Sequence, residues 1–120
     1  LLVYNDPALV GALPPQEYDA EMRTCIAHAD ELRSEGRLLD SQQLESPATA
    51  KSVRIRNGRQ STVDGPFAET KELLGGFNLI EAADMDEAVR IAASFPWART
   101  GCIEVRPVHD FAAERQRVGA

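Results

Sequence analysis

Residues 75–96 read Gly-Gly-Phe-Asn-Leu-Ile-Glu-Ala-Ala-Asp-Met-Asp-Glu-Ala-Val-Arg-Ile-Ala-Ala-Ser-Phe-Pro. The glycine pair opens an apolar strand over 77–82, and Asp84 followed three residues later by Glu87 is typical of a helix N-terminus. Pro96 ends this helix, because proline disfavours helical backbone in the residue before it. We expect the buried side of the helix to consist of Ala88, Val89, Ala92 and Phe95. A strand that leads directly into a capped helix is half of an α+β unit.

The N-terminal part of the chain predicts a second strand and helix. Residues 1–4 are apolar and followed by a loop up to Pro14-Pro15, and a helix starts after these prolines and stops at Gly36. Its apolar positions recur at helical spacing: Tyr18, Met22, Cys25, Ile26, Ala29 and Leu32. Residues 38–44 follow as an irregular segment or a weak strand.

Residues 51–64 alternate in polarity around Asn57-Gly58, which is a strong hairpin signal. A two-residue turn would pair Val53 with Thr62, whereas a three-residue loop would pair Val53 with Val63 on one face. We expect the three-residue loop, with Gly58 at positive φ.

A last strand over 102–106 and a frayed polar tail from His109 complete the order of elements. This order predicts an α+β domain over residues 1–120 with a ferredoxin-like βαββαβ arrangement and an extra hairpin. Both helices would cover one face of an antiparallel sheet. Because Val3 and Tyr4, like Leu79 and Ile80, point to opposite faces, apolar side chains would also occupy the uncovered face. We therefore expect a homodimer.

Composition excludes several classes of function. The chain has 120 residues and a mass of 13.1 kDa, with 13 Lys and Arg against 19 Asp and Glu, so a net charge of −6 disfavours nucleic acid as a partner. No stretch approaches the length of a membrane span or a signal peptide, so we expect a cytoplasmic protein without a membrane partner. The first residue is Leu, and we expect residues to precede it. No phosphate-binding loop, His-x-x-x-His pair or Ser-His-Asp pattern is evident, so we expect no metal and no cofactor.

Three strings carry a family resemblance: residues 64–72 (Asp-Gly-Pro-Phe-Ala-Glu-Thr-Lys-Glu), residues 75–77 and residues 101–108. They resemble the DGPF subfamily of YCII-related proteins. The resemblance implies a small bacterial cytoplasmic protein with a dimeric α/β-barrel-like assembly and a cleft suspected to be an active site. It also implies a genomic link to sigma factors, and hence a regulatory role as one alternative.

The chain departs from the relatives believed to be catalytic. Those relatives resemble one another in a His on the first helix and an Asp in a late Asp-Pro-Phe motif. Here Cys25 falls at the first position and Phe95-Pro96-Trp97 at the second. His28, one turn further along, would have to turn inward to replace the missing His.

The remaining candidates are charged residues near strand ends. Asp64, beside Glu69 and Glu72, is the candidate acid or base, although Asp-Gly-Pro is also simple turn chemistry. Arg106 is the candidate for holding an anion, or else an intersubunit ion-pair partner of the same carboxylates. The other ligand-binding candidates are Lys71, Glu104, Tyr4 and Phe67.

We expect Asp64, Glu69, Lys71 and Arg106 to share one polar pocket near the dimer interface. Two functions stay open for such a pocket. One is a cofactor-free isomerase or lyase that moves a proton on a small anionic molecule. The other is a non-catalytic ligand-binding or regulatory module.

Overall fold

The structure is a computed structural model that describes residues 1–67 and 70–120. Its β-strands are β1 (Leu2–Asn5), β2 (Leu38–Gln43), β3 (Lys51–Arg56), β4 (Arg59–Asp64), β5 (Leu73–Ile80) and β6 (Gly101–Glu104). Its α-helices are α1 (Pro7–Gly11), α2 (Pro15–Ser34), α3 (Met85–Ser94) and α4 (Phe111–Val118). Short 3₁₀ turns, η1 (Pro47–Thr49) and η2 (Pro96–Ala98), follow β2 and α3.

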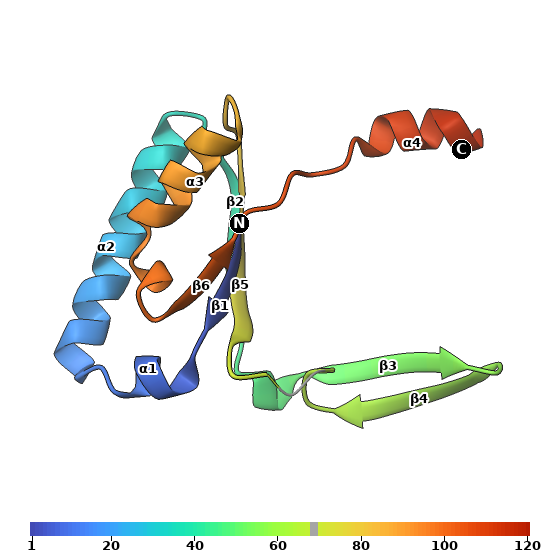
Figure 1. Ribbon diagram of the computed structural model, residues 1–120, viewed down its shortest axis with the longest axis horizontal. Helices are drawn as coiled ribbons and strands as arrows, with labels where there is room; N and C mark the ends of the chain where they lie inside the picture. The colour runs from blue at the N-terminus through green and yellow to red at the C-terminus, as the bar shows by residue number, and fades with distance from the viewer. Residues whose placement is uncertain (68–69) are drawn as a thin grey trace.

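Four strands form an antiparallel sheet in the order β2-β5-β1-β6, and α2 and α3 cover one of its faces (Figure 1). This arrangement is consistent with the expected ferredoxin-like fold. The core between the helices and the sheet is built on Leu32, Leu38, Ile91 and Phe95. Val3 on β1 is also buried, whereas its neighbour Tyr4 shares the uncovered face with Leu74 and Cys102. We call that uncovered side the open face.

Local signals in the sequence explain where the two long helices begin and end. The Asp84 side chain caps α3 by accepting a hydrogen bond of 2.8 Å from the Glu87 backbone N–H. Gly36 ends α2 at a φ of +74°, which lets Arg37 N–H donate to the Leu32 carbonyl at 2.9 Å. Both boundaries confirm the sequence prediction.

The hairpin register differs from the expected one. Asn57 and Gly58, with φ of 53° and 73°, form a two-residue turn that pairs Val53 with Thr62. Such a turn matches the twist of its strands. The three-residue loop was expected because it pairs Val53 with Val63 on one face, which a buried face would favour. The hairpin lies outside the core, so neither of its faces has to be apolar.

Several predicted boundaries and burial assignments are also corrected. Strand β5 already starts at Leu73, because the glycine pair lies inside the strand, and β6 ends at Glu104. The expected loop after β1 contains α1, residues 38–43 form the regular strand β2, and the tail contains α4. Ile26 and Val89 are exposed, and Ile91 takes a core position instead.

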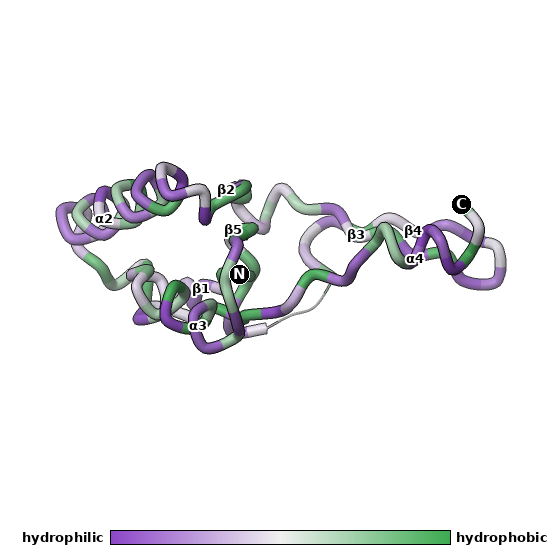
Figure 2. The backbone as a smooth tube through the Cα atoms, turned by 90° about the horizontal axis from the view of Figure 1, so that it is seen from above, coloured by the Kyte–Doolittle hydropathy of each residue, from purple (hydrophilic) through white to green (hydrophobic). Residues whose placement is uncertain are grey.

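Two segments project from the body: the β3–β4 hairpin and α4. Figure 1 shows both on the side of the sheet opposite α2 and α3, with α4 at the top and the hairpin at the bottom, and Figure 2 shows both at the end of the molecule away from α2. The Cα radius of gyration is 17.1 Å, against roughly 14 Å for a compact chain of this length. The excess reflects these two projecting arms.

Candidate functional site

A cavity of about 130 Å³ lies between α2 and the helix-covered face of the sheet. Side chains from α1, α2, η2 and three strands surround it. Its apolar and aromatic side chains are Val3, Val10, Tyr18, Met22, Cys25 and Trp97, and it is also bordered by Phe77, whose side chain lies on the other face of the sheet. The remaining lining residues are Asn5, Ser41, Gln42, Gln43, Asn78 and the Gly75-Gly76 pair. We call this space the helix–sheet cavity.

The aromatic wall of the cavity joins two distant parts of the chain. The Tyr18 and Trp97 rings lie 5.7 Å apart between centroids and are tilted by 39°. Tyr18 lies in the first turns of α2, and Trp97 lies in the turn that follows the Phe95-Pro96 end of α3. The Pro96 break therefore places an aromatic ring over the N-terminal part of α2, where it closes one side of the cavity.

The polar part of the cavity comes from strand positions that face the helices. Ser41 Oγ on β2 donates a hydrogen bond of 2.6 Å to Asn78 Oδ1 on β5, and Asn78 is only 9% exposed. Asn5 Oδ1 is buried without a hydrogen-bond partner within the described part of the chain. Buried polar atoms are normally paired, so an unpaired acceptor beside a cavity is suited to a ligand or water.

Glycines at 75 and 76 make room for these polar side chains. A Cβ at Gly75 would lie 2.2 Å from Asn5 Nδ2, so a larger residue would push the Asn5 amide away. A Cβ at Gly76 would lie 2.7 Å from the Gln42 carbonyl oxygen, where the β2 backbone approaches β5. The glycine pair expected to open a strand therefore sets the spacing of three strands at the cavity.

Sequence reasoning did not single out Asn5, Ser41 or Asn78. Asn78 carries the clearest signal, because it lies between Gly76 and Ile80 at a position that alternation assigns to the buried face. Asn5 was assigned to loop-forming residues, and Ser41 to a weak strand.

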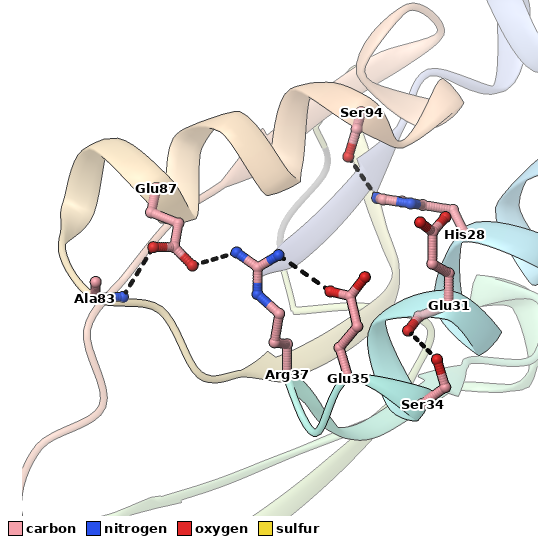
Figure 3. A network of polar contacts seen from close by, with 8 residues as sticks. All are labelled: His28, Glu31, Ser34, Glu35, Arg37, Ala83, Glu87 and Ser94. Atoms are coloured by element: carbon pink, nitrogen blue, oxygen red, sulfur yellow. Dashed lines mark hydrogen bonds and ion pairs between the residues drawn. The ribbon is translucent and has the colours of Figure 1, made fainter.

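His28 does not turn toward the cavity. Its ring packs edge-on against Phe95 at 4.6 Å, and Nε2 contacts Ser94 Oγ on α3 at 2.5 Å (Figure 3). The single hydroxyl hydrogen of Ser94 is donated to the Ile91 carbonyl. His28 must therefore donate from Nε2 to Ser94. In this arrangement His28 joins α2 to α3 and supplies no free base to the cavity.

The charged candidates find separate partners within one chain. Asp64 pairs with Lys51 at 2.6 Å in the hairpin. Gly65 has a positive φ of 94°, as suits a turn, but within the described residues Asp64 accepts no backbone N–H of that turn. Lys71 lies 3.6 Å from the buried carboxylate of Asp6. Arg106 pairs with Glu104 at 2.6 Å. Asp64, Lys71 and Arg106 therefore do not form the expected common pocket within a single chain.

The other sequence candidates among the described residues lie outside the helix–sheet cavity. Tyr4 is on the open face, and Phe67 is highly exposed beneath the Arg54 guanidinium at 5.9 Å. The Glu72 carbonyl accepts a hydrogen bond from Thr70, and Glu69 lies outside the described residues. Arg106 borders an open groove of about 530 Å³ beside the N-terminus of α3.

An ion-pair network links α2 and α3 at a place away from the cavity. Arg37 bridges Glu35 and Glu87, and Glu87 also accepts a hydrogen bond of 3.4 Å from Ala83 N–H (Figure 3). The hydrogen bond from Arg37 lowers the pKa of the Glu87 carboxyl and raises the pKa of the Arg37 guanidinium. This network connects the end of α2 to the start of α3 and does not border the cavity.

The fold and the cavity together define an α+β domain with a small, partly open site between a helix and a sheet. Residues 1–112 match the YCII-related domain family, and the chain belongs to that family. The chain is also similar to an uncharacterized protein from Rhizobium meliloti (strain 1021). The two are 37% identical over 110 residues, which cover 90% of this chain and 89% of the relative. In the described ranges, no helix has the length and apolar character needed to cross a membrane.

Proposed function

We propose that this YCII-related protein is a non-catalytic module that binds a small, uncharged, partly polar molecule in the helix–sheet cavity. The observation that carries this proposal is the lining of the cavity. Among the described residues, it contains no Asp, Glu, His, Lys or Arg side chain. The ionisable side chains in its described lining are Tyr18 and Cys25, so the cavity lacks a carboxylate or histidine to move a proton, whereas binding needs only complementary shape and hydrogen bonds.

The positions that carry the acid-base dyad in the resembled relatives support the same conclusion. Cys25 lines the cavity where the His of those relatives would fall, and Phe95 is buried in the core where the Asp would fall. Neither replacement supplies a carboxylate. The string at 64–67 further favours membership of the DGPF subfamily.

The polarity and size of the cavity indicate the class of ligand. Asn5 offers an unused acceptor, and Ser41 and Asn78, which are hydrogen-bonded to each other, add further polar atoms to the wall. A ligand with one hydrogen-bond donor would satisfy the Asn5 acceptor. Because apolar cavities near 150 Å³ hold a molecule the size of benzene, we expect about six to eight non-hydrogen atoms. The net charge of −6 further disfavours the anionic ligand expected from the sequence.

A matched pair of probes tests this proposal. Isobutyramide and isobutyrate have the same shape, but only the carboxylate is charged. We expect isobutyramide to change the fluorescence of Trp97, the single tryptophan, and to shift the side-chain amide NMR signal of Asn78. Isobutyrate should bind at least tenfold more weakly. The variant Cys25→Met fills the cavity and should abolish binding, whereas Cys102→Met, on the open face, should retain it.

Two results would contradict the binding-module proposal. Tighter binding of isobutyrate, lost in Arg106→Ala or Lys71→Ala, would instead favour the anionic ligand. Turnover in a screen of small metabolites, abolished by Asp64→Asn, would favour the proton-transfer enzyme.

We also propose that the protein is a homodimer that packs through the open face. Leu79, Leu74 and Leu39 are exposed there, and Tyr4 and Phe77 are only half-buried. A large uncovered apolar surface favours association. Light scattering should give twice the chain mass of 13.1 kDa. Leu79→Glu should shift the protein toward monomer, whereas Val89→Glu, on the outer side of α3, should not. A monomeric wild-type protein would refute the dimer.

A further inference from the structure

We propose that the β3–β4 hairpin is an arm that grips a second copy of this chain. This inference rests on the proposed homodimer and adds a second contact surface to it. Figure 1 shows the hairpin on the same side of the sheet as the open face, where the second copy would pack. An arm attached at the edge of that face would reach along the flank of the partner.

The hairpin lacks the packing that normally stabilises two strands. Within the described residues, β3 and β4 form a separate two-stranded sheet, and Val53 and Ile55 remain 60% and 62% exposed. A two-stranded hairpin alone is marginally stable in water, even with a favourable Asn-Gly turn. A surface that covers these side chains would stabilise it.

The register divides the hairpin into two chemically different faces. Val53 and Ile55 lie opposite Thr62 and Gln60 on one face. The other face carries three guanidiniums, with Arg56 directly opposite Arg59 and Arg54 two residues away. Like charges in directly opposed positions destabilise a strand pair. None of these three arginines forms an ion pair within residues 1–67 and 70–120.

The positive charge of the arm is complementary to the negative charge of the rest of the molecule. Residues 51–64 contain four basic side chains and one acidic one, a net charge of +3, whereas the whole chain carries −6. The remainder therefore carries −9. A second copy presents an acidic surface to a basic arm, and such complementarity favours association in a defined orientation. Because the molecule as a whole repels polyanions, a second copy fits the arm better than nucleic acid or an anionic membrane.

Photo-crosslinking tests where the arm lies. With p-benzoylphenylalanine in place of Ile55, irradiation should give a covalent dimer, and mixed light and heavy isotope-labelled protein should show that the link joins two copies. The same replacement at Ile26, which is 53% exposed on α2, provides the control and should give little dimer. Absence of an intermolecular link at Ile55, in a protein that light scattering shows to be dimeric, would overturn the arm and leave the dimer intact.

Charge reversal tests the electrostatic part. The triple variant Arg54→Glu, Arg56→Glu and Arg59→Glu should raise the dimer dissociation constant at least tenfold at low salt, and added salt should reduce this difference. The control is a second triple variant, Arg23→Glu, Arg33→Glu and Arg90→Glu, which has the same net charge but carries its changes on α2 and α3. It should change the dimer dissociation constant less than threefold. Equal effects of both triple variants would overturn the proposal. So would a monomeric wild type that binds phosphatidylglycerol vesicles through these arginines.

Discussion

Replacing Gly101 by alanine tests how closely β6 approaches β1. An alanine Cβ at this position would lie 1.9 Å from the Tyr4 carbonyl oxygen and 3.0 Å from Asn5 Cα. Both are backbone atoms, so no side chain can rotate to relieve the contact. The two strands must separate by about 1.5 Å for the 1.9 Å contact to reach the 3.4 Å at which ordinary van der Waals contacts begin.

The expected cost follows from three contributions. Overpacking costs about 1–3 kcal/mol, and loss of one or two hydrogen bonds between the separated strands adds about 0.5–1.5 kcal/mol each. The smaller conformational freedom of alanine in the unfolded chain returns about 0.4–1 kcal/mol. The middle of these ranges gives a net destabilisation of about 3 kcal/mol, or roughly 12 °C in melting temperature for a domain of this size.

Thermal and urea unfolding at one protein concentration provide the assay. Gly11→Ala is the matched control, because no atom lies within 4 Å of its added Cβ and its φ is not positive. That variant should be as stable as the wild type or up to about 1 kcal/mol more stable. If Gly101→Ala melts within 2 °C of Gly11→Ala, the close approach of β1 and β6 is wrong.

Three further predictions follow from other parts of the molecule. Gly76→Ala should destabilise the protein by about 1–3 kcal/mol, because its Cβ meets the Gln42 backbone. Gly75→Ala should cost less than about 1 kcal/mol, because only the Asn5 side chain must move. Equal melting temperatures of the two variants would contradict this difference. Gly58→Val should cost about 1–2 kcal/mol, because Gly58 has a φ of +73°. This loss should appear as faster amide hydrogen exchange in β3 and β4, and unchanged exchange would show that the turn tolerates valine. Arg37 lowers the pKa of Glu87 below its ordinary value of 4.5, so the pair stabilises the folded state above that pH and loses its contribution as the pH falls through the lowered pKa. Glu87→Gln should therefore melt below the wild type at pH 7, and the gap should close in acid; a gap that is constant with pH would refute the linkage.

Sequence patterns predicted those parts of the fold that short-range chemistry controls. Asp84 with Glu87 located the start of α3, and Gly36 located the end of α2. The order of strands and helices then led to the four-stranded sheet. These features depend on neighbouring residues, so one sequence is sufficient to find them.

The remaining features depend on contacts between distant residues. The glycine pair at 75–76 was interpreted as a strand boundary, whereas its small size serves the approach of β1 and β2 to β5. The hairpin register was inferred by assuming a buried face that the chain does not provide. The helix–sheet cavity needed the positions of α1, α2, η2 and three strands, so the polar residues that line it could not be recognised from spacing alone.

The orientation of the His28 ring determines how the two covering helices are joined. His28 donates from Nε2 to Ser94, because the Ser94 hydroxyl hydrogen is directed to Ile91. The Ser94 oxygen therefore accepts a hydrogen bond from α2 while it donates one within α3. The polar link between the helices needs a ring N–H at position 28 and a hydroxyl at position 94, whereas the packing on Phe95 needs only the ring.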